Sequence, residues 1–239
     1  MKSLSLLLLM LLIISACQPA QTPPEEPAME SEWIALFDGT STEHWKTYNS
    51  DEFPSQGWQI EGDELVFRPV PTEEWTSGLD IITREQFQDF ELEMEWNVAE
   101  GSNSGIFYFV IEQPEKAIYW SGLEMQILDN ENHPDATQGV DGNRKATSLY
   151  DLIPAVPQNA KPFGEWNHVK IISKGPKVEH WMNGEKVLEF ERFTAEWDSM
   201  LANSKFVDHP EFGAATQGHI GLQDHGDVVR FRNIRIRKL

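Results

Sequence analysis

The stretch Phe90-Glu91-Leu92-Glu93-Met94-Glu95-Trp96-Asn97-Val98 decides the fold class of this 239-residue chain. Apolar and polar residues alternate along it without a break, so one set of side chains points to a core and the other to water. This period of two is typical of a strand in an antiparallel sheet that has one solvated face. The stretch therefore predicts a sheet that is packed on one side only.

Further strand patterns follow toward the C-terminus. Residues 106–111 are apolar throughout, which predicts a strand covered on both faces. Residues 178–190 contain two alternating runs joined by Asn183-Gly184, the strongest short-range indication of a hairpin. Residues 229–237 alternate with a slip of one residue, which predicts a β-bulge near Asn233 and outward-facing arginines.

Helix patterns are poor, and the only candidate runs from about Thr194 to Leu201. Many short strands separated by Gly, Pro and Asn turns predict an all-β fold. The expected architecture is a two-sheet antiparallel sandwich, in which one face and its loops would form the site.

The N-terminus carries the pattern of a secretion signal. Lys2 precedes an apolar run that ends at Ile14 and is too short to span a bilayer. Ile14-Ser15-Ala16-Cys17 resembles a bacterial lipobox, and a plain secretory signal with a chance cysteine is the alternative. The expected organisation is a signal peptide (1–16), a lipidated Cys17 with a flexible tether (17–32) and a folded domain (33–239).

The predicted lipid would anchor the protein in the cell envelope, and Gln18 after the cysteine resembles outer-membrane lipoproteins. The formal net charge is -20, with acidic residues spread along the chain. A nucleic-acid backbone or an anionic bilayer attracts a basic surface, so we expect no nucleic-acid partner and no membrane contact except through the lipid. With Cys17 lipidated, the domain holds neither a disulfide nor a thiol nucleophile.

Two polar clusters predict where a site lies. The strand pattern at 123–128 puts Glu124 and Gln126 on one face, and it leads into a loop dense in carboxylates and amides that contains His133. The second cluster, residues 223–227, also follows a short strand. Two strands that deliver acids, amides and histidines to loops suit a polar small-molecule site, and ordinary turn chemistry of Asn and Asp is the alternative.

A series of motifs runs in order from about Trp33 to the end of the chain. They are Leu36-Phe37-Asp38-Gly39, His44-Trp45-Lys46, residues 57–65, Asp89-Phe90-Glu91-Leu92, Asn103-Ser104-Gly105-Ile106, residues 124–135, Ser148-Leu149-Tyr150-Asp151, Gly164-Glu165-Trp166-Asn167, residues 178–184, residues 218–226 and Phe231-Arg232-Asn233-Ile234. Together they resemble the bacterial 3-keto-disaccharide hydrolase domain, long known as a domain of unknown function. The resemblance implies a jelly-roll sandwich of the concanavalin A-like lectin and glucanase type. It also implies cleavage of glycosides that a separate sugar 3-dehydrogenase has oxidised to a ketone at carbon 3.

Such a ketone would determine the chemistry. It acidifies the hydrogen on carbon 2, so a base can remove that proton, the group on carbon 1 can leave by elimination, and water can add afterwards. This route needs a general base, a proton donor and donors for the enolate oxygen. The expected acid and base candidates are Glu124, His133 and His225, with Asp129 as a further member of the catalytic set.

Direct hydrolysis by a carboxylate pair is the alternative mechanism. Residues 124–129 keep the spacing of the Glu-x-Asp-x-x-Glu strand of laminarinase-type enzymes, but the middle Asp is Gln126 and the last Glu is Asp129. The shorter Asp129 side chain changes the separation of the two carboxyls, on which retaining hydrolysis depends. Elimination is therefore the favoured hypothesis.

Amide side chains are candidates for holding sugar hydroxyls because an amide both donates and accepts hydrogen bonds. Lys145 would stabilise an enolate and Trp181 would stack on a ring. Solvation of Lys145, core packing of Trp181 and turn chemistry at Asn183 are the alternatives. The expected sugar-binding residues are Gln126, Asn103, Lys145, Trp181, Asn183, Gln223 and Asp224.

No cofactor is required by this chemistry, and the sequence has no His and Cys spacing typical of zinc. Residues 129–135 place Asp, Glu and His at every second position, and Asp141 follows, so a structural calcium ion is an alternative even though the EF-hand glycine is missing. The remaining histidines of strand patterns, His168, His180 and His219, are expected to face the core.

Two other functions stay open on the sequence alone. A non-catalytic carbohydrate-binding envelope lipoprotein would use a lectin-like face, and a scaffold domain would be tethered to an envelope complex. The nine tryptophans suit either sugar binding or a core. The clustered acids and histidines favour the enzyme, because a pure binder needs rings and amides but not those groups.

Overall fold

The alternation at residues 90–98 forms the middle of a large sheet. A computed structural model describes residues 31–70 and 78–239, and the signal peptide, Cys17 and most of the tether expected from the sequence lie outside the described residues. The strands are β1 (Ile34–Phe37), β2 (Trp45–Thr47), β3 (Trp58–Glu61), β4 (Glu64–Phe67), β5 (Ile81–Thr83), β6 (Phe90–Val98), β7 (Asn103–Val110), β8 (Leu123–Leu128), β9 (Asn167–Lys174), β10 (Lys177–Met182), β11 (Glu185–Glu191), β12 (His219–Leu222) and β13 (Val229–Lys238). The helical elements are the short 3-10 helices η1 (Ile118–Trp120) and η2 (Pro134–Thr137), and α1 (Ala195–Ala202).

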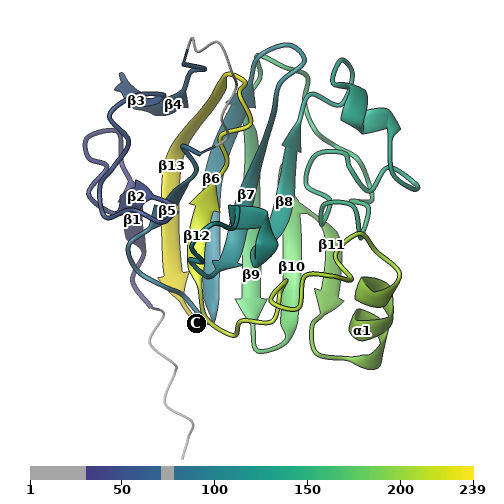
Figure 1. The fold of residues 1–239 in the computed structure, drawn as a ribbon. Helices are drawn as coiled ribbons and strands as arrows, with labels where there is room; N and C mark the ends of the chain where they lie inside the picture. The colour runs from purple at the N-terminus through teal and green to yellow at the C-terminus, as the bar shows by residue number, and fades with distance from the viewer. Residues whose placement is uncertain (1–30, 71–77) are drawn as a thin grey trace, which may run out of the picture. The chain divides into compact units, whose positions relative to one another are not determined.

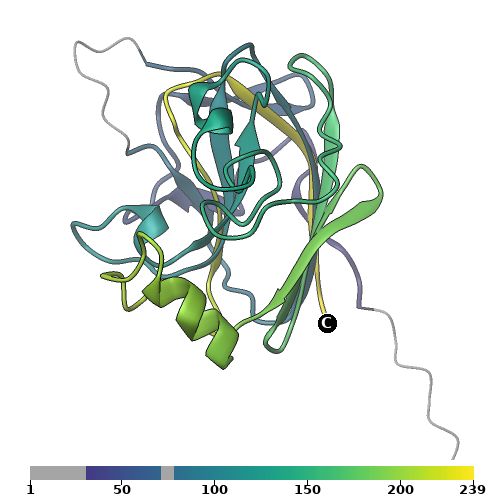
Figure 2. The same cartoon turned by 90° about the vertical axis from the view of Figure 1, so that its right-hand side faces the viewer.

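The strands form two antiparallel sheets that pack against each other (Figures 1 and 2). The larger sheet has the order β11-β10-β9-β6-β13-β4-β3, with β1 paired to β13, and the smaller sheet has the order β2-β5-β12-β7-β8. This confirms the predicted all-β jelly-roll sandwich. Within the described residues, no helix has the length and apolar character needed to cross a membrane.

The hydrophobic core fills the space between the sheets. On β6, Phe90, Leu92 and Met94 are at most 1% exposed, whereas Glu93 and Glu95 lie on the outer face. Their burial removes apolar surface from water, which is the main favourable contribution to folding. The arginines of β13 face outward as predicted, and three of the four pair with glutamates of β6, while Arg230 pairs with Glu64 of β4. The pairs are Arg232 with Glu95, Arg235 with Glu93, and Arg237 with Glu91.

Three local predictions are confirmed. The hairpin is β10–β11, and its turn has φ values of 49° at Asn183 and 87° at Gly184, the positive angles that a tight hairpin turn needs. The register of β13 against β6 shifts around Asn233, where the bulge was expected. The helix predicted at 194–201 is α1, which Thr194 caps at its N-terminus.

The face of the smaller sheet that points away from the core is covered by irregular segments. They are residues 111–122, which contain η1, the long segment 129–166 and the segment 203–218. In Figure 1 the segment between β8 and β9 lies at the upper right. Part of it pairs with the free edge of β8, since Gln126 N donates to the Ser148 carbonyl at 3.1 Å and Tyr150 N to the Glu124 carbonyl at 3.0 Å. These segments enclose a pocket over β7 and β8.

Candidate active site

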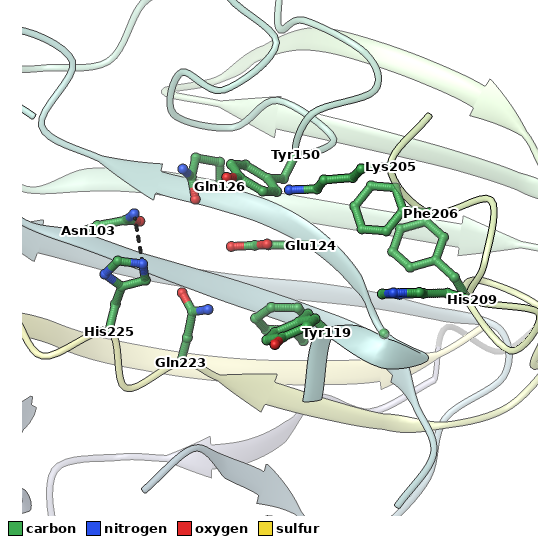
Figure 3. A pocket seen from close by; sticks show the side chains of 13 residues that line it. Asn103, Tyr119, Glu124, Gln126, Tyr150, Lys205, Phe206, His209, Gln223 and His225 are labelled. Atoms are coloured by element: carbon green, nitrogen blue, oxygen red, sulfur yellow. Dashed lines mark hydrogen bonds between the residues drawn. The ribbon is translucent and has the colours of Figure 1, made fainter. Parts of the chain in front are cut away.

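The pocket has a volume of about 330 Å³, at the lower end of the range for ligand sites. Strands β7 and β8 form its floor, and Figure 3 shows Glu124 near the middle with different side chains to either side. The lining residues are Asn103, Phe107, Tyr119, Gly122, Glu124, Gln126, Tyr150, Lys205, Phe206, His209, Phe212, Gln223 and His225.

Glu124 is a buried carboxyl on the pocket floor. The alternation of β8 turns its side chain away from the core, in the same direction as Gln126, yet it is only 8% exposed because loops cover it. Burial raises the pKa of Glu124 to about 8; the Lys205 charge opposes the rise, and the Asp80 and Asp135 charges add to it. The carboxyl is therefore mostly protonated at neutral pH and can donate a proton.

Space for this carboxyl comes from Gly105 on β7. A Cβ atom added at Gly105 would lie 2.4 Å from Glu124 Oε1 and 3.0 Å from Glu124 Cδ. Atoms in a packed interior do not approach that closely without displacement. Any side chain at position 105 would therefore move the carboxyl from its place on the floor.

Asn103 and His225 form one end of the pocket (Figure 3). Asn103 Nδ2 donates to Nε2 of the neutral His225 ring at 3.3 Å, and Asp227 Oδ2 lies 3.9 Å from His225 Nδ1. Burial lowers the pKa of His225 below its usual value; Asp227 opposes this shift and His133 adds to it. The imidazole is therefore neutral at neutral pH and can accept a proton.

Two glutamines complete this polar end. Gln223 Oε1 is buried and has no hydrogen-bond partner among the described residues, so it is an acceptor available to a ligand hydroxyl. With its amide nitrogen turned toward Glu124, Gln126 donates to Glu124 Oε1 at 3.2 Å and to the Ser104 carbonyl at 3.1 Å. Amides at these positions can recognise the hydroxyls of a sugar ring.

His133 and Asp129 lie beside the pocket but do not line it. The His133 and His225 ring centroids are 6.3 Å apart, and His133 Nδ1 accepts the Asp135 backbone N–H at 3.1 Å. Burial acts to raise the pKa of Asp129, but hydrogen bonds led by the Gly101 N–H, at 2.8 Å, outweigh it and lower that pKa. The turn chemistry considered above thus accounts for the Asp129 contacts, and the structure does not place Asp129 in the pocket with Glu124.

Four of the expected sugar-binding residues also lie away from the pocket lining. Trp181 is on the outer face of β10, where Lys170 Nζ lies 4.5 Å from its ring centroid, so its side chain neither packs in the core nor lines the pocket. Asn183 is in the hairpin turn and accepts the His168 backbone N–H at 3.0 Å, which favours the turn interpretation. Lys145 lies in the segment after β8 and is not among the lining residues. Asp224 is buried and accepts the Gly226 backbone N–H at 2.9 Å, so its carboxylate takes part in a turn.

The other histidines divide between the core and the surface. His180 is fully buried, as predicted; it bonds Tyr108 Oη at 2.8 Å, and burial lowers its pKa to about 4. His219 is 6% exposed, but it lies on the opposite face of β12 from the core residues Ile220 and Leu222, so it is covered without facing the core between the sheets. The prediction for His168 is wrong, because Val169 takes the core position on β9 and leaves the His168 side chain 44% exposed on the outer face.

The calcium hypothesis finds no assembled site in the described part of the chain. Across residues 31–70 and 78–239, no group of three or more His, Cys, Asp or Glu side chains is arranged to hold a metal ion. One of the carboxylates in the proposed loop, Asp135, instead pairs with Arg144 at 2.9 Å. The calcium ion stays a prediction from the residue spacing.

The end of the pocket opposite His225 was missed by the sequence analysis. It is lined by Lys205, Phe206, His209 and Phe212 from the segment after α1, and Figure 3 shows Tyr119 of η1 and Tyr150 from the segment beside β8 on either side of Glu124, where this end begins. These segments have no strand or helix period. The rings of Phe206, His209 and Phe212, close together in the sequence, are the one pattern that could have indicated this end of the site.

Residues 32–237 match the family model described as a 3-keto-alpha-glucoside-1,2-lyase-like domain. A Bacteroides thetaiotaomicron protein named 3-keto-disaccharide hydrolase is 45% identical over 228 residues, which cover 87% of this chain and 78% of that protein.

Solved structures are similar as well. One is the crystal structure of a Parabacteroides distasonis protein that is provisionally described as a glycosyl hydrolase. It has a TM-score of 0.78 and 31% sequence identity, and the match covers 87% of this chain and 94% of that protein. A Bacillus subtilis protein with a galectin-like fold has a TM-score of 0.52 and 16% identity, with coverage of 87% and 94%. The second likeness bears on the fold alone.

Proposed function

Since this chain belongs to the family of 3-keto-alpha-glucoside-1,2-lyase-like domains, we propose that it cleaves the glycosidic bond of 3-keto-disaccharides and related 3-keto-glycosides. The family and the 45% identity to a named hydrolase identify a glycoside-cleaving enzyme. One observation carries the mechanistic proposal: Glu124, with a pKa raised to about 8, shares a pocket with His225, whose pKa is lowered. At neutral pH one group holds a proton to give and the other can take one.

In the proposed first step, the Asn103 amide shifts its N–H from His225 Nε2 to the substrate, and the Nε2 lone pair so released removes the proton from carbon 2 of the 3-keto sugar. The carbon–hydrogen bond breaks, its electron pair forms a double bond between carbons 2 and 3, and the ketone oxygen becomes an enolate. The Asn103 and Gln223 amides line the same end of the pocket and supply donors for that oxygen and for neighbouring hydroxyls. The sugar ring would therefore occupy the polar end.

In the second step, Glu124 gives its proton to the leaving oxygen. The enolate electrons return to form a double bond between carbons 1 and 2, and the bond from carbon 1 to the leaving oxygen breaks. Water then adds hydroxyl to carbon 1 and hydrogen to carbon 2. The sum is hydrolysis without net oxidation or reduction. A non-catalytic binder has no need of two oppositely shifted groups in one pocket, so their presence supports the enzyme.

Elimination can be tested through the hydrogen on carbon 2. During turnover in heavy water, we expect the released 3-keto sugar to gain one deuterium at carbon 2, because the second half-reaction takes that hydrogen from solvent. Mass spectrometry measures the uptake, and product incubated without enzyme corrects for spontaneous exchange. Absence of enzymatic uptake would assign direct displacement at carbon 1.

Gly105 offers a test of where the Glu124 carboxyl must lie. We expect Gly105→Ala to lower kcat about tenfold, because the added Cβ displaces the acid from its alignment with the leaving oxygen. The matched control is Gly78→Ala, since a Cβ at Gly78 meets no atom of the described residues within 4 Å. Steady-state kinetics and circular dichroism of both variants are compared. An unchanged kcat in folded Gly105→Ala would show that this position of the carboxyl does not matter.

We also propose how the substrate and the enzyme reach each other. Oxidation at carbon 3 by a separate sugar dehydrogenase would supply the ketone. A lipid on Cys17 would hold the enzyme in the cell envelope, at the outer membrane. Support for this location is the sequence pattern alone, because Cys17 is outside the described residues.

A further inference from the structure

The pocket continues beyond Glu124 into an enclosure made mostly of aromatic rings. Figure 3 shows Phe206 and His209 on the side of Glu124 opposite His225. Phe206 stacks on Phe212 with a centroid separation of 3.9 Å, and His209 stacks on Trp120 at 3.8 Å. The walls of this end are thus ring faces and ring edges that already pack on one another.

Two polar groups that line this enclosure, and Trp120 behind it, are already held by carboxylates, while His209 Nδ1 is buried without a hydrogen-bond partner among the described residues. A hydroxyl that enters would lose its water and find few replacements, which costs free energy for each unpaired group. The pairs are Tyr150 Oη with Asp135 at 3.0 Å, Trp120 Nε1 with Glu211 at 3.0 Å and Lys205 Nζ with Asp151 at 3.4 Å.

The two ends of the pocket therefore differ in what they can bind. The polar end offers hydroxyls the Asn103 amide and the Gln223 oxygen, which has no hydrogen-bond partner in the described part of the chain. The aromatic end offers apolar surface, and the exposed face of Tyr119, which is 48% exposed, lies at its edge. Glu124, the proposed proton donor to the leaving oxygen, lies between them.

The aromatic end is also fixed in shape before a ligand enters. The 3-10 helix η1 and the segment after α1 are joined by the Trp120–Glu211 hydrogen bond and by a bond from Gly213 N to the Ser121 carbonyl at 2.9 Å. A preformed wall loses little freedom on binding, so its contacts contribute more fully to affinity.

We propose that the leaving group binds at this aromatic end, and that the enzyme prefers 3-keto-glycosides of aromatic alcohols to those whose leaving group is a second sugar. The inference rests on the proposed function, because it takes the sugar ring to the polar end and the leaving oxygen to Glu124. Tyr119 is the residue that stacks on the leaving group at the mouth of the pocket.

The test compares three 3-keto-glucosides that carry a benzyl, a methyl or a glucosyl group on carbon 1. In all three the leaving oxygen belongs to an alkyl alcohol rather than a phenol, so differences in rate reflect the pocket more than intrinsic reactivity. We expect kcat/KM for the benzyl compound to exceed that for each of the others about tenfold. Tyr119→Ala should reduce the benzyl-to-methyl ratio severalfold, and Tyr119→Phe should retain it. Phe163→Ala, which removes a 39% exposed ring elsewhere, is the matched control.

Calorimetric titration of the Glu124→Gln protein with the same compounds separates this inference from the proposed function. A benzyl preference in Kd that Tyr119→Ala reduces supports the aromatic leaving-group site, even if the native enzyme cleaves none of the compounds and the proposed function fails. Cleavage or binding in which the glucosyl compound equals or exceeds the benzyl compound overturns the inference and leaves the proposed function standing.

Discussion

Replacing Glu124 with glutamine should lower kcat on a 3-keto-disaccharide by about 10³-fold, within the usual contribution of general acid–base catalysis. Glutamine keeps the shape of the side chain and can occupy the space beside Gly105, but it has no acidic proton to give to the leaving oxygen. Circular dichroism should be unchanged. The loss should be much smaller for a 3-keto 4-nitrophenyl glycoside, because nitrophenoxide leaves without protonation. An equal loss on both substrates would contradict the acid role.

The pH dependence of kcat/KM tests the role of Glu124 as the acid independently. The pKa of Glu124 is raised to about 8, so the protonated form predominates below that pH and is lost as the pH rises through it. In the native enzyme, kcat/KM should therefore fall on the alkaline side of about pH 8. In Glu124→Gln this limb should disappear. Persistence of the limb in the variant would assign it to another group.

Replacing His225 with alanine should lower kcat by about 10²-fold and reduce deuterium uptake at carbon 2 to the same extent. Burial lowers the pKa of His225, so the neutral base is present at neutral pH and is lost only as the pH falls below the usual histidine range. The acid limb of the native pH profile should thus lie below pH 6.5 and be absent from the variant.

Two controls accompany this substitution. Added imidazole should restore part of the activity of His225→Ala, because a small base can enter the space that the ring leaves. His168→Ala removes an exposed ring from the outer face of the larger sheet and should have native kinetics. Exchange at carbon 2 at the native rate in His225→Ala would show that another group is the base.

Most of the fold was predictable because it depends on periodicity. The alternation of β6 determines which side chains are buried, and the Asn183-Gly184 turn and the slip at Asn233 are local features with local sequence patterns. His168 shows the limit of such reasoning. A residue adjacent to Val169 on a one-sided strand must face outward, and its residue type alone suggested the opposite.

The polar end of the site was predictable for the same reason, and the aromatic end was not. Glu124 and Gln126 are on a strand whose period assigns them a face, and Gln223 and His225 follow a strand directly. Phe206 reaches the pocket from an irregular segment far along the chain, through contacts that no local pattern encodes. The substrate came from the family resemblance rather than from periodicity.

The two ends of the pocket are also carried by different kinds of structure. Glu124, the proposed proton donor, and its amide neighbour Gln126 are on a strand of the smaller sheet, while the ring wall comes from η1 and from the segment 203–218 that connects α1 to β12. Connecting segments tolerate substitution, insertion and deletion far better than paired strands. If the leaving group binds at the ring wall as proposed, changes in these segments would alter the range of leaving groups while the acid and amide on the strands stay in place.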